Sequence, residues 1–241
     1  MDAPSDALRQ MLVRQLSNSQ IKNRVQDYTM PYRELMSYYR CAMMEVETKF
    51  NVLNEELSLM YDRNPIESVK SRLKSPESIV DKAVRKEIPL TPESIEANLY
   101  DIAGIRVICS FPGDIYMLAD ALLRQDDITL IERKDYIKTP KENGYRSLHL
   151  VIDVPVYLSG AKVYIPVEVQ IRTVAMDFWA SLEHNLRYKA EGETPAFIVE
   201  ELKKCADVIT ETDARMEQIF HAMQLLRDQP SDILDQYMAD Q

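Results

Sequence analysis

Two acidic side chains, Asp101 and Glu168, each lie beside or within a run of residues typical of a β-strand. Asp101 precedes the apolar run Ile102–Cys109, and Glu168 lies in the alternating run Val163–Arg172. Carboxylates that hold Mg²⁺ and accept a proton, with cations that neutralise phosphate oxygens, are what phosphoryl or pyrophosphoryl transfer requires. The pair therefore predicts chemistry on a nucleotide phosphate if basic side chains lie nearby.

Basic side chains form three clusters in the sequence. Lys70, Arg72 and Lys74 alternate along one stretch, Lys82, Arg85 and Lys86 follow within one helical turn of each other, and residues 133–146 hold five bases against two acids. Acids are interleaved with the first two clusters, so a solvated, salt-bridged surface is the alternative reading. The chain has only five glycines and no Walker A sequence, so side chains rather than a backbone loop must bind phosphates.

The runs Asn143–Ile152 and Val163–Arg172 are close enough in sequence to pair as a β-hairpin. Period-two alternation then collects polar side chains on one face of the sheet: Tyr145, Ser147, His149, Glu168, Gln170 and Arg172. A solvated sheet face is the alternative. Tyr145 offers a flat surface for a purine, or is an ordinary cross-strand aromatic residue.

Two helices are predicted before these strands, over residues 6–27 and 31–61. The second carries a heptad seam with spacings of three and four residues: Met36, Tyr39, Met43, Val46, Phe50, Leu53, Leu57 and Met60. The seam indicates either packing within the chain's own domain or oligomerisation. Asn64, Pro65 and Glu67 resemble the start of a further helix, although the stretch after them also alternates as a strand does.

The remaining elements follow from capping residues and apolar patterns. Ser75 begins a short helix, a helix near 114–124 precedes a strand near 128–134, and Thr173 caps another helix. A last helix is predicted over about 196–227, followed by a frayed terminus. We expect an α+β fold with a mixed sheet of about five strands, divided into helices at 1–63, a core at 64–190 and an acidic segment at 191–241.

Composition excludes several classes of protein. The net charge of −10 argues against general coating of nucleic acid, and residues 191–241 carry twelve acids against four bases, which leaves the body close to neutral. No apolar run reaches the length of a membrane helix, and the N-terminus has no secretory signal pattern. Three scattered cysteines indicate a reducing cytoplasm, and three isolated histidines argue against zinc.

Five ordered motifs resemble the synthetase domain of the RelA/SpoT family, and the likeness runs from about residue 64 to 189. They are Asp101–Arg106, Lys134–Ile137, Asn143–His149, Glu168–Thr173 and Asp177–His184. The chain is similar to a small alarmone synthetase of the RelP type. This resemblance implies a nucleotidyltransferase-like fold, a homotetramer built through helices, and transfer of the β,γ-pyrophosphate of ATP to the 3′-hydroxyl of GDP or GTP. No histidine is followed by aspartate, so only the synthetase activity is expected.

The resemblance also implies residue roles. Asp101 would bind Mg²⁺, and Glu168 would activate the 3′-hydroxyl with possible metal contact. The expected ATP-binding residues are Arg72 and Arg106 around adenine, with Lys74, Lys82 and Arg85 on the phosphates. Those expected for GDP or GTP are Tyr145 stacked on guanine, with Lys134, Lys141, His149 and Gln170. The role of Arg146 is left open, and so is the preference between GDP and GTP, because Glu132 departs from the family pattern.

Two other readings remain. The fold could serve as a regulatory module that binds single-stranded RNA through Tyr145 and the basic clusters, without turnover. Alternatively, the carboxylate pair could support transfer of a nucleotidyl group with release of pyrophosphate. Asp101 and Glu168 argue against the first reading, because a binding module has no use for buried acids beside phosphates.

Overall fold

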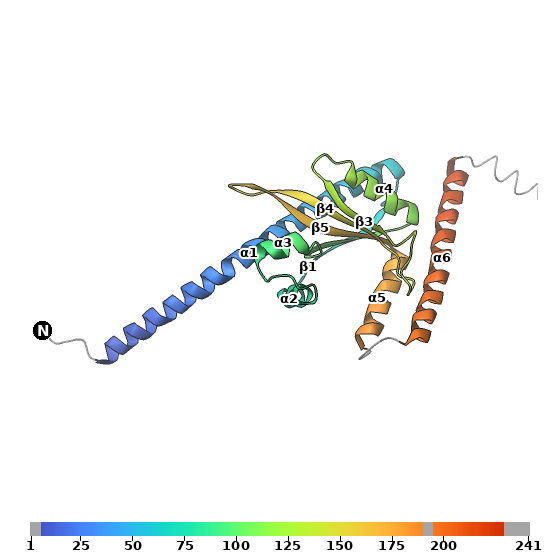
Figure 1. Cartoon of the computed structure of the whole chain (residues 1–241). Helices are drawn as coiled ribbons and strands as arrows, with labels where there is room; N and C mark the ends of the chain where they lie inside the picture. Colours follow the sequence, from blue (N-terminus) through green and yellow to red (C-terminus); the bar gives the residue numbers. More distant parts are fainter. Residues whose placement is uncertain (1–5, 190–194, 229–241) are drawn as a thin grey trace, which may run out of the picture.

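A computed structural model of the chain describes residues 6–189 and 195–228, and Figure 1 shows its arrangement. In chain order the elements are α1 Asp6–Tyr61, β1 Ile66–Leu73, α2 Pro76–Arg85, α3 Pro92–Asn98, β2 Ala103–Cys109, α4 Pro112–Leu123, β3 Thr129–Asp135, β4 Leu148–Tyr157, β5 Lys162–Thr173, α5 Val174–Lys189 and α6 Ala196–Asp228. No helix within the described part is both long and apolar enough to cross a membrane.

The centre of the fold is a five-stranded mixed sheet in the order β1-β2-β5-β4-β3. Strands β2 and β5 run parallel, and the other neighbours are antiparallel. The predicted hairpin is β4 and β5, which pair from Leu148↔Ile171 to Tyr157↔Lys162. The expected α+β fold with a mixed sheet of five strands is confirmed.

Helices α1 and α4 cover the apolar face of the sheet. Their side chains join those of the strands in one core that includes Phe50 of α1, Leu118 of α4 and Val169 of β5. The seam residues from Tyr39 to Leu57 are buried there, whereas Met60 is 65% exposed. The seam therefore packs within the chain's own domain, which resolves the alternative left open by its spacing.

Helix α1 differs from the sequence prediction at one point. Residues 6–27 and 31–61 were expected as separate helices, but they form a single helix of 56 residues that passes through Pro31. In Figure 1 its first half extends away from the sheet and its second half lies across it. The predicted break was wrong because proline can be accommodated in a long helix that tertiary packing stabilises beyond it.

Local capping signals gave one correct and one incorrect helix start. Ser75 accepts a hydrogen bond from the backbone N–H of Ser78 and begins α2, as predicted. Asn64 and Pro65 do not start a helix, because β1 begins at Ile66 and pairs with β2. The backbone carbonyl of Pro65 instead accepts a hydrogen bond from Ser110 N. Pairing with β2 thus overrides the local capping signal.

The predicted first strand of the hairpin starts too early. Strand β4 begins at Leu148, so residues 143–147 form a loop in place of the expected strand extension. Gly144 in this loop has a φ of +89°, which is incompatible with a strand. The other predicted elements are present: Thr173 accepts a hydrogen bond from Met176 N at the start of α5, and α6 spans Ala196–Asp228. The predicted frayed terminus lies outside the described residues.

Candidate active site

The strand register places one polar side chain from each strand in a single row across the sheet. Lys70 of β1 pairs with Arg106 of β2, which pairs with Gln170 of β5. Gln170 pairs with His149 of β4, which pairs with Lys134 of β3. Paired residues project to the same side of a sheet, so this row lies opposite the apolar face that α1 covers. The sheet therefore offers a continuous polar surface.

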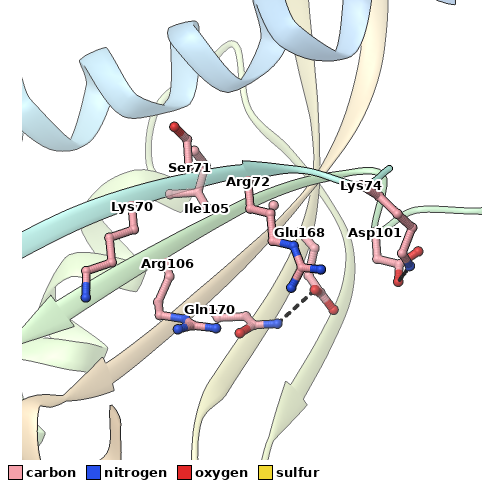
Figure 2. A pocket seen from close by; sticks show the side chains of 10 residues that line it. Lys70, Ser71, Arg72, Lys74, Asp101, Ile105, Arg106, Glu168 and Gln170 are labelled. Carbon is pink, nitrogen blue, oxygen red and sulfur yellow. Dashed lines mark hydrogen bonds and ion pairs between the residues drawn. The ribbon is translucent and has the colours of Figure 1, made fainter. Parts of the chain in front are cut away.

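A cavity of about 530 Å³ opens on this polar face (Figure 2). Its lining includes both predicted carboxylates, Asp101 just before β2 and Glu168 on β5. The other lining residues are Lys70, Ser71, Arg72, Lys74, Gly104, Ile105, Arg106 and Gln170. Figure 2 shows Lys74 beside Asp101, with Arg106 and Gln170 near each other along the cavity. Cations and carboxylates thus line one cavity.

Asp101 is held by two lysines on one of its oxygens. Nζ of Lys74 and Nζ of Lys82 each donate to Oδ2 at 2.5 Å. Burial alone would raise the pKa of Asp101, but the hydrogen bonds and charges of the two lysines outweigh burial and lower it. Its other oxygen, Oδ1, is buried without a hydrogen-bond partner. The carboxylate is therefore ionised and has one oxygen available for a ligand.

Glu168 is surrounded by neutral or weakly basic partners. Gln170 Nε2 donates to Glu168 Oε2 at 2.9 Å, and His149 Nδ1 lies 3.6 Å from Oε1. Burial raises the pKa of Glu168, but the interactions with His149 and Gln170 lower it by more than burial raises it. The pKa of Glu168 is therefore below its usual value. An ionised carboxylate in this position can accept a proton from a substrate hydroxyl.

Tyr145 is linked to Glu168 through His149. The Tyr145 hydroxyl lies 2.8 Å from His149 Nε2, and Arg172 Nη2 donates to the same hydroxyl at 2.7 Å. Because the hydroxyl accepts from Arg172, its own hydrogen can be donated to Nε2, which leaves the imidazole hydrogen on Nδ1 toward Glu168. Burial raises the pKa of Tyr145, so the phenol is neutral at physiological pH.

A second cavity of about 420 Å³ adjoins the first. The two share Arg72, Arg106 and Gln170 in their lining, and Tyr145 and Arg172 line only the second. The wall on α5 is formed by Ala180, Ser181, Glu183, His184 and Asn185. The shared arginines thus lie between a cavity with both carboxylates and a cavity with the tyrosine. Two adjacent spaces suit two nucleotides that must react with each other.

Arg172 and Asp177 are site residues to which the sequence analysis assigned no role. Arg172 is only 4% exposed and donates to Gln170 Oε1 at 2.6 Å and to Asp177 Oδ1 at 3.2 Å. Asp177 also lies 3.3 Å from Arg106 Nη1. Asp177 thereby orients two arginines of the second cavity. Strand alternation did place Arg172 on the polar face, but nothing in the sequence indicated its partners on α5.

Five predicted ligands lie outside the lining of both cavities. Arg85 is exposed on α2 and bonds the backbone of Asp81, whereas Lys134 on β3 donates to Glu132 at 2.7 Å. Lys141 lies over the rings of Tyr136 and Tyr145 at 4.7 and 4.9 Å from their centroids. Lys82 and His149 also lie outside the linings of these two cavities, but they contact the two carboxylates directly.

The donor set fits a divalent metal ion bound together with phosphates. Asp101 presents a buried oxygen without a partner, and Glu168 lines the same cavity. Within the described residues, no group of three or more His, Cys, Asp or Glu side chains is placed to hold a metal on its own. One or two carboxylates with the remaining ligands from phosphate and water are typical of Mg²⁺ at nucleotide sites.

Comparison with known proteins assigns the chain to a family. The family described as "Region found in RelA / SpoT proteins" matches residues 71–193, which include both carboxylates and both shared arginines. The chain therefore belongs to the RelA/SpoT family.

Two curated relatives match this chain over most of their own length. GTP pyrophosphokinase YwaC of Bacillus subtilis is 46% identical over 178 residues, which are 74% of this chain and 85% of that protein. GTP pyrophosphokinase YjbM of the same organism is 39% identical over 181 residues, covering 75% and 84%. The crystal structure of small alarmone synthetase 2 from Bacillus subtilis matches with a TM-score of 0.72 and 43% identity, covering 79% of this chain and 98% of that one. Small alarmone synthetase 1 bound to its product pppGpp matches at 0.71 and 36%, covering 83% and 98%.

Proposed function

We propose the following reaction and residue roles for the chain, which is a GTP pyrophosphokinase of the small alarmone synthetase class. The β,γ-pyrophosphate of ATP is transferred to the 3′-hydroxyl of GDP or GTP. The observation that carries this proposal is that Asp101 and Glu168 line one cavity together with Arg72, Arg106 and Lys74. That combination of ionised acids and cations suits phosphate chemistry.

ATP occupies the cavity that contains both carboxylates. Arg72 and Arg106, whose guanidinium groups lie between the two cavities, stack on adenine. Lys74 and Lys82, now paired with Asp101, neutralise the phosphates, and Arg85 on the same helix as Lys82 joins them from outside the cavity. Asp101, whose Oδ1 is buried without a partner among the described residues, would hold Mg²⁺ together with Glu168.

The acceptor nucleotide occupies the second cavity. Tyr145 stacks on guanine, and the row of His149, Gln170 and Lys134 brings polar groups from three neighbouring strands to its ribose and phosphates. Lys141 reaches the phosphates from the loop above the Tyr145 ring. In this arrangement Tyr145 recognises the base and Glu168 serves the ribose, with His149 between the two residues.

Glu168 removes the proton from the 3′-hydroxyl, and the 3′-oxygen attacks the β-phosphorus of ATP. A bond forms between that oxygen and the β-phosphorus. The bond from the β-phosphorus to the oxygen it shares with the α-phosphorus breaks, so that AMP leaves with this oxygen. A divalent ion, when bound, neutralises charge on the phosphate oxygens. The lysines beside Asp101 supply further positive charge in the same cavity.

Labelled ATP separates this reaction from the two rivals. Incubation with ATP labelled at the γ-phosphorus, GDP and Mg²⁺ should place the label on the guanine nucleotide and release unlabelled AMP. Labelled free pyrophosphate would instead indicate transfer of a nucleotidyl group. A protein that binds single-stranded RNA but leaves ATP unchanged would be a regulatory module.

Five further features remain proposals. We propose Mg²⁺ as the divalent ion, on the oxygen-only donor set of Asp101 and Glu168. A homotetramer built through helices follows from the family resemblance alone, whereas single-stranded RNA as a regulator is proposed from the basic clusters and Tyr145. The RelP type also follows from the resemblance, and the proposed cytoplasmic location follows from the three scattered cysteines.

A further inference from the structure

We propose that Arg146 is a positioning residue that fixes Tyr145 by tying its loop to helix α6. The inference rests on the proposed function of Tyr145 as the stacking surface for guanine. It gives α6 a part in acceptor recognition, although no residue of α6 lines either described cavity.

Arg146 points away from the cavities and into α6. Its Nη1 donates to the backbone carbonyl of Ala206 at 2.9 Å and also to the hydroxyl of Thr210. Its Nη2 lies 3.4 Å from Asp207 Oδ1, and the side chain is only 15% exposed. A guanidinium that is this far buried with three acceptors on one helix fixes both position and direction of the chain that carries it.

Gly144 brings the same loop into backbone contact with α6. A Cβ at this position would lie 2.6 Å from Cβ of Ala206 and 3.1 Å from Cα of Lys203. The φ of +89° also favours glycine. Since Gly144 and Arg146 flank Tyr145 on either side, the backbone of the stacking residue is held against α6 at both neighbours.

Helix α5 completes the support for Tyr145. A small cluster of Trp179, Ala180 and Ala206 has Tyr145 packed against it, together with Leu202 and Ile209 of α6. Trp179 Nε1 donates to the backbone carbonyl of Leu202 at 2.9 Å, and its ring centroid lies 6.5 Å from that of Tyr145. The Tyr145 loop therefore lies between two helices that are joined to each other.

Helix α6 is itself anchored to the body of the domain at two further points. Thr173 at the end of β5 donates to Asp213 Oδ2 at 2.5 Å, and Asp213 is only 7% exposed. Glu217 accepts a hydrogen bond from Gly113 N, at the start of α4, at 2.7 Å. These contacts hold α6 in place without Arg146. Loss of Arg146 should release the loop while the helix stays docked.

The test compares substrate dependence in Arg146→Met and wild type. We expect the KM for GDP to rise at least about five-fold. The KM for ATP and the kcat at saturation should be nearly unchanged, because only the position of Tyr145, which stacks on guanine, is altered. Arg146→Lys keeps one donor for the Ala206 carbonyl, so its KM for GDP should lie between those of wild type and Arg146→Met. Arg215→Met removes an exposed arginine elsewhere on α6 and is the matched control, with no expected change.

Thr210→Val tests the same contact from the helix. It should raise the KM for GDP as well, and the double variant with Arg146→Met should show less than the product of the two effects. Thr210→Val also tests the proposal if Arg146→Met fails to fold, as judged by circular dichroism. Trp179, the only tryptophan of the chain, reports GDP binding without ATP through its fluorescence. The Kd for GDP measured in this way should rise in the same variants as the KM for GDP.

Three results would overturn the inference. One is an unchanged KM and Kd for GDP in both Arg146→Met and Thr210→Val. Another is an equal rise in the KM for ATP, which would indicate general damage to the site. The third is a multiplicative effect in the double variant. Tyr145→Leu distinguishes failure of the underlying proposal: if its KM for GDP is normal, Tyr145 does not stack on guanine whatever Arg146 does.

Discussion

His149 Nδ1 on β4 lies 3.6 Å from Glu168 Oε1 on the neighbouring strand β5. The interaction with His149 is the largest of those that lower the pKa of Glu168 against the effect of burial. Glu168 acts as a base only when ionised. A lowered pKa of Glu168 should therefore preserve activity at lower pH, and we expect the acid limb of the pH profile to lie below the usual range for a glutamate.

His149→Leu should move that acid limb to higher pH. Without the imidazole, burial dominates and the pKa of Glu168 rises, so the ionised fraction is lost earlier as the pH falls. The measurement is kcat against pH with both nucleotides saturating, which removes any loss of acceptor binding from the comparison. An acid limb at the wild-type position, with activity otherwise measurable, would show that His149 does not tune the base.

Asp101→Asn should abolish turnover and leave the chain folded. The substitution removes the negative charge that we assign to the metal ion and that pairs with Lys74 and Lys82. Because the pKa of Asp101 is lowered in the folded state, its contribution to stability is present above the pKa of the unfolded chain and lost as the pH falls through the lowered value.

Two measurements check the Asp101 prediction. Activity should not return at high Mg²⁺, and the difference in melting temperature between wild type and variant should be present at pH 7 and shrink toward strongly acidic pH. Wild-type turnover at saturating Mg²⁺ would remove Asp101 from the metal site. A stability difference that grows as the pH falls would contradict the lowered pKa.

Phe50→Ala should destabilise the domain by about 3–5 kcal/mol, the usual cost of truncating a buried aromatic residue. Phe50 is fully buried in the core that α1 forms with the sheet. Phe197→Ala is the matched control, because Phe197 is 65% exposed and its loss should change stability little. Urea unfolding followed by circular dichroism measures both. Equal midpoints for the two variants would show that the seam does not pack on the sheet.

Much of the fold could be predicted because local patterns and tertiary structure agree. Alternation placed Glu168, Gln170 and Arg172 on one face, and the register of β4 and β5 brings His149 beside them. Asp101 was identifiable as the one carboxylate at the mouth of a buried strand. These features depend on strand periodicity, which the order of residues alone determines.

The remainder of the site depends on contacts between segments far apart in the sequence. Residues 143–147 alternate like a strand, but contact with α6 and the positive φ of Gly144 make them a loop. Arg146 has its acceptors about sixty residues later, at Ala206 and Thr210. Burial of Arg172 likewise depends on Tyr145 and Asp177. No local pattern carries such information, which is why these roles were missed or left open.

The central claim is that Glu168 is the base that activates the 3′-hydroxyl. Glu168→Gln keeps the shape of the side chain and removes the base, and exposed Glu67→Gln on β1 is the matched control. The most direct measurement is kcat of the two variants at saturating ATP, GDP and Mg²⁺, with GDP binding followed by Trp179 fluorescence. The account predicts a fall in kcat of at least about 10²-fold for Glu168→Gln, with GDP still bound and Glu67→Gln unchanged. A near-normal kcat in Glu168→Gln would contradict it.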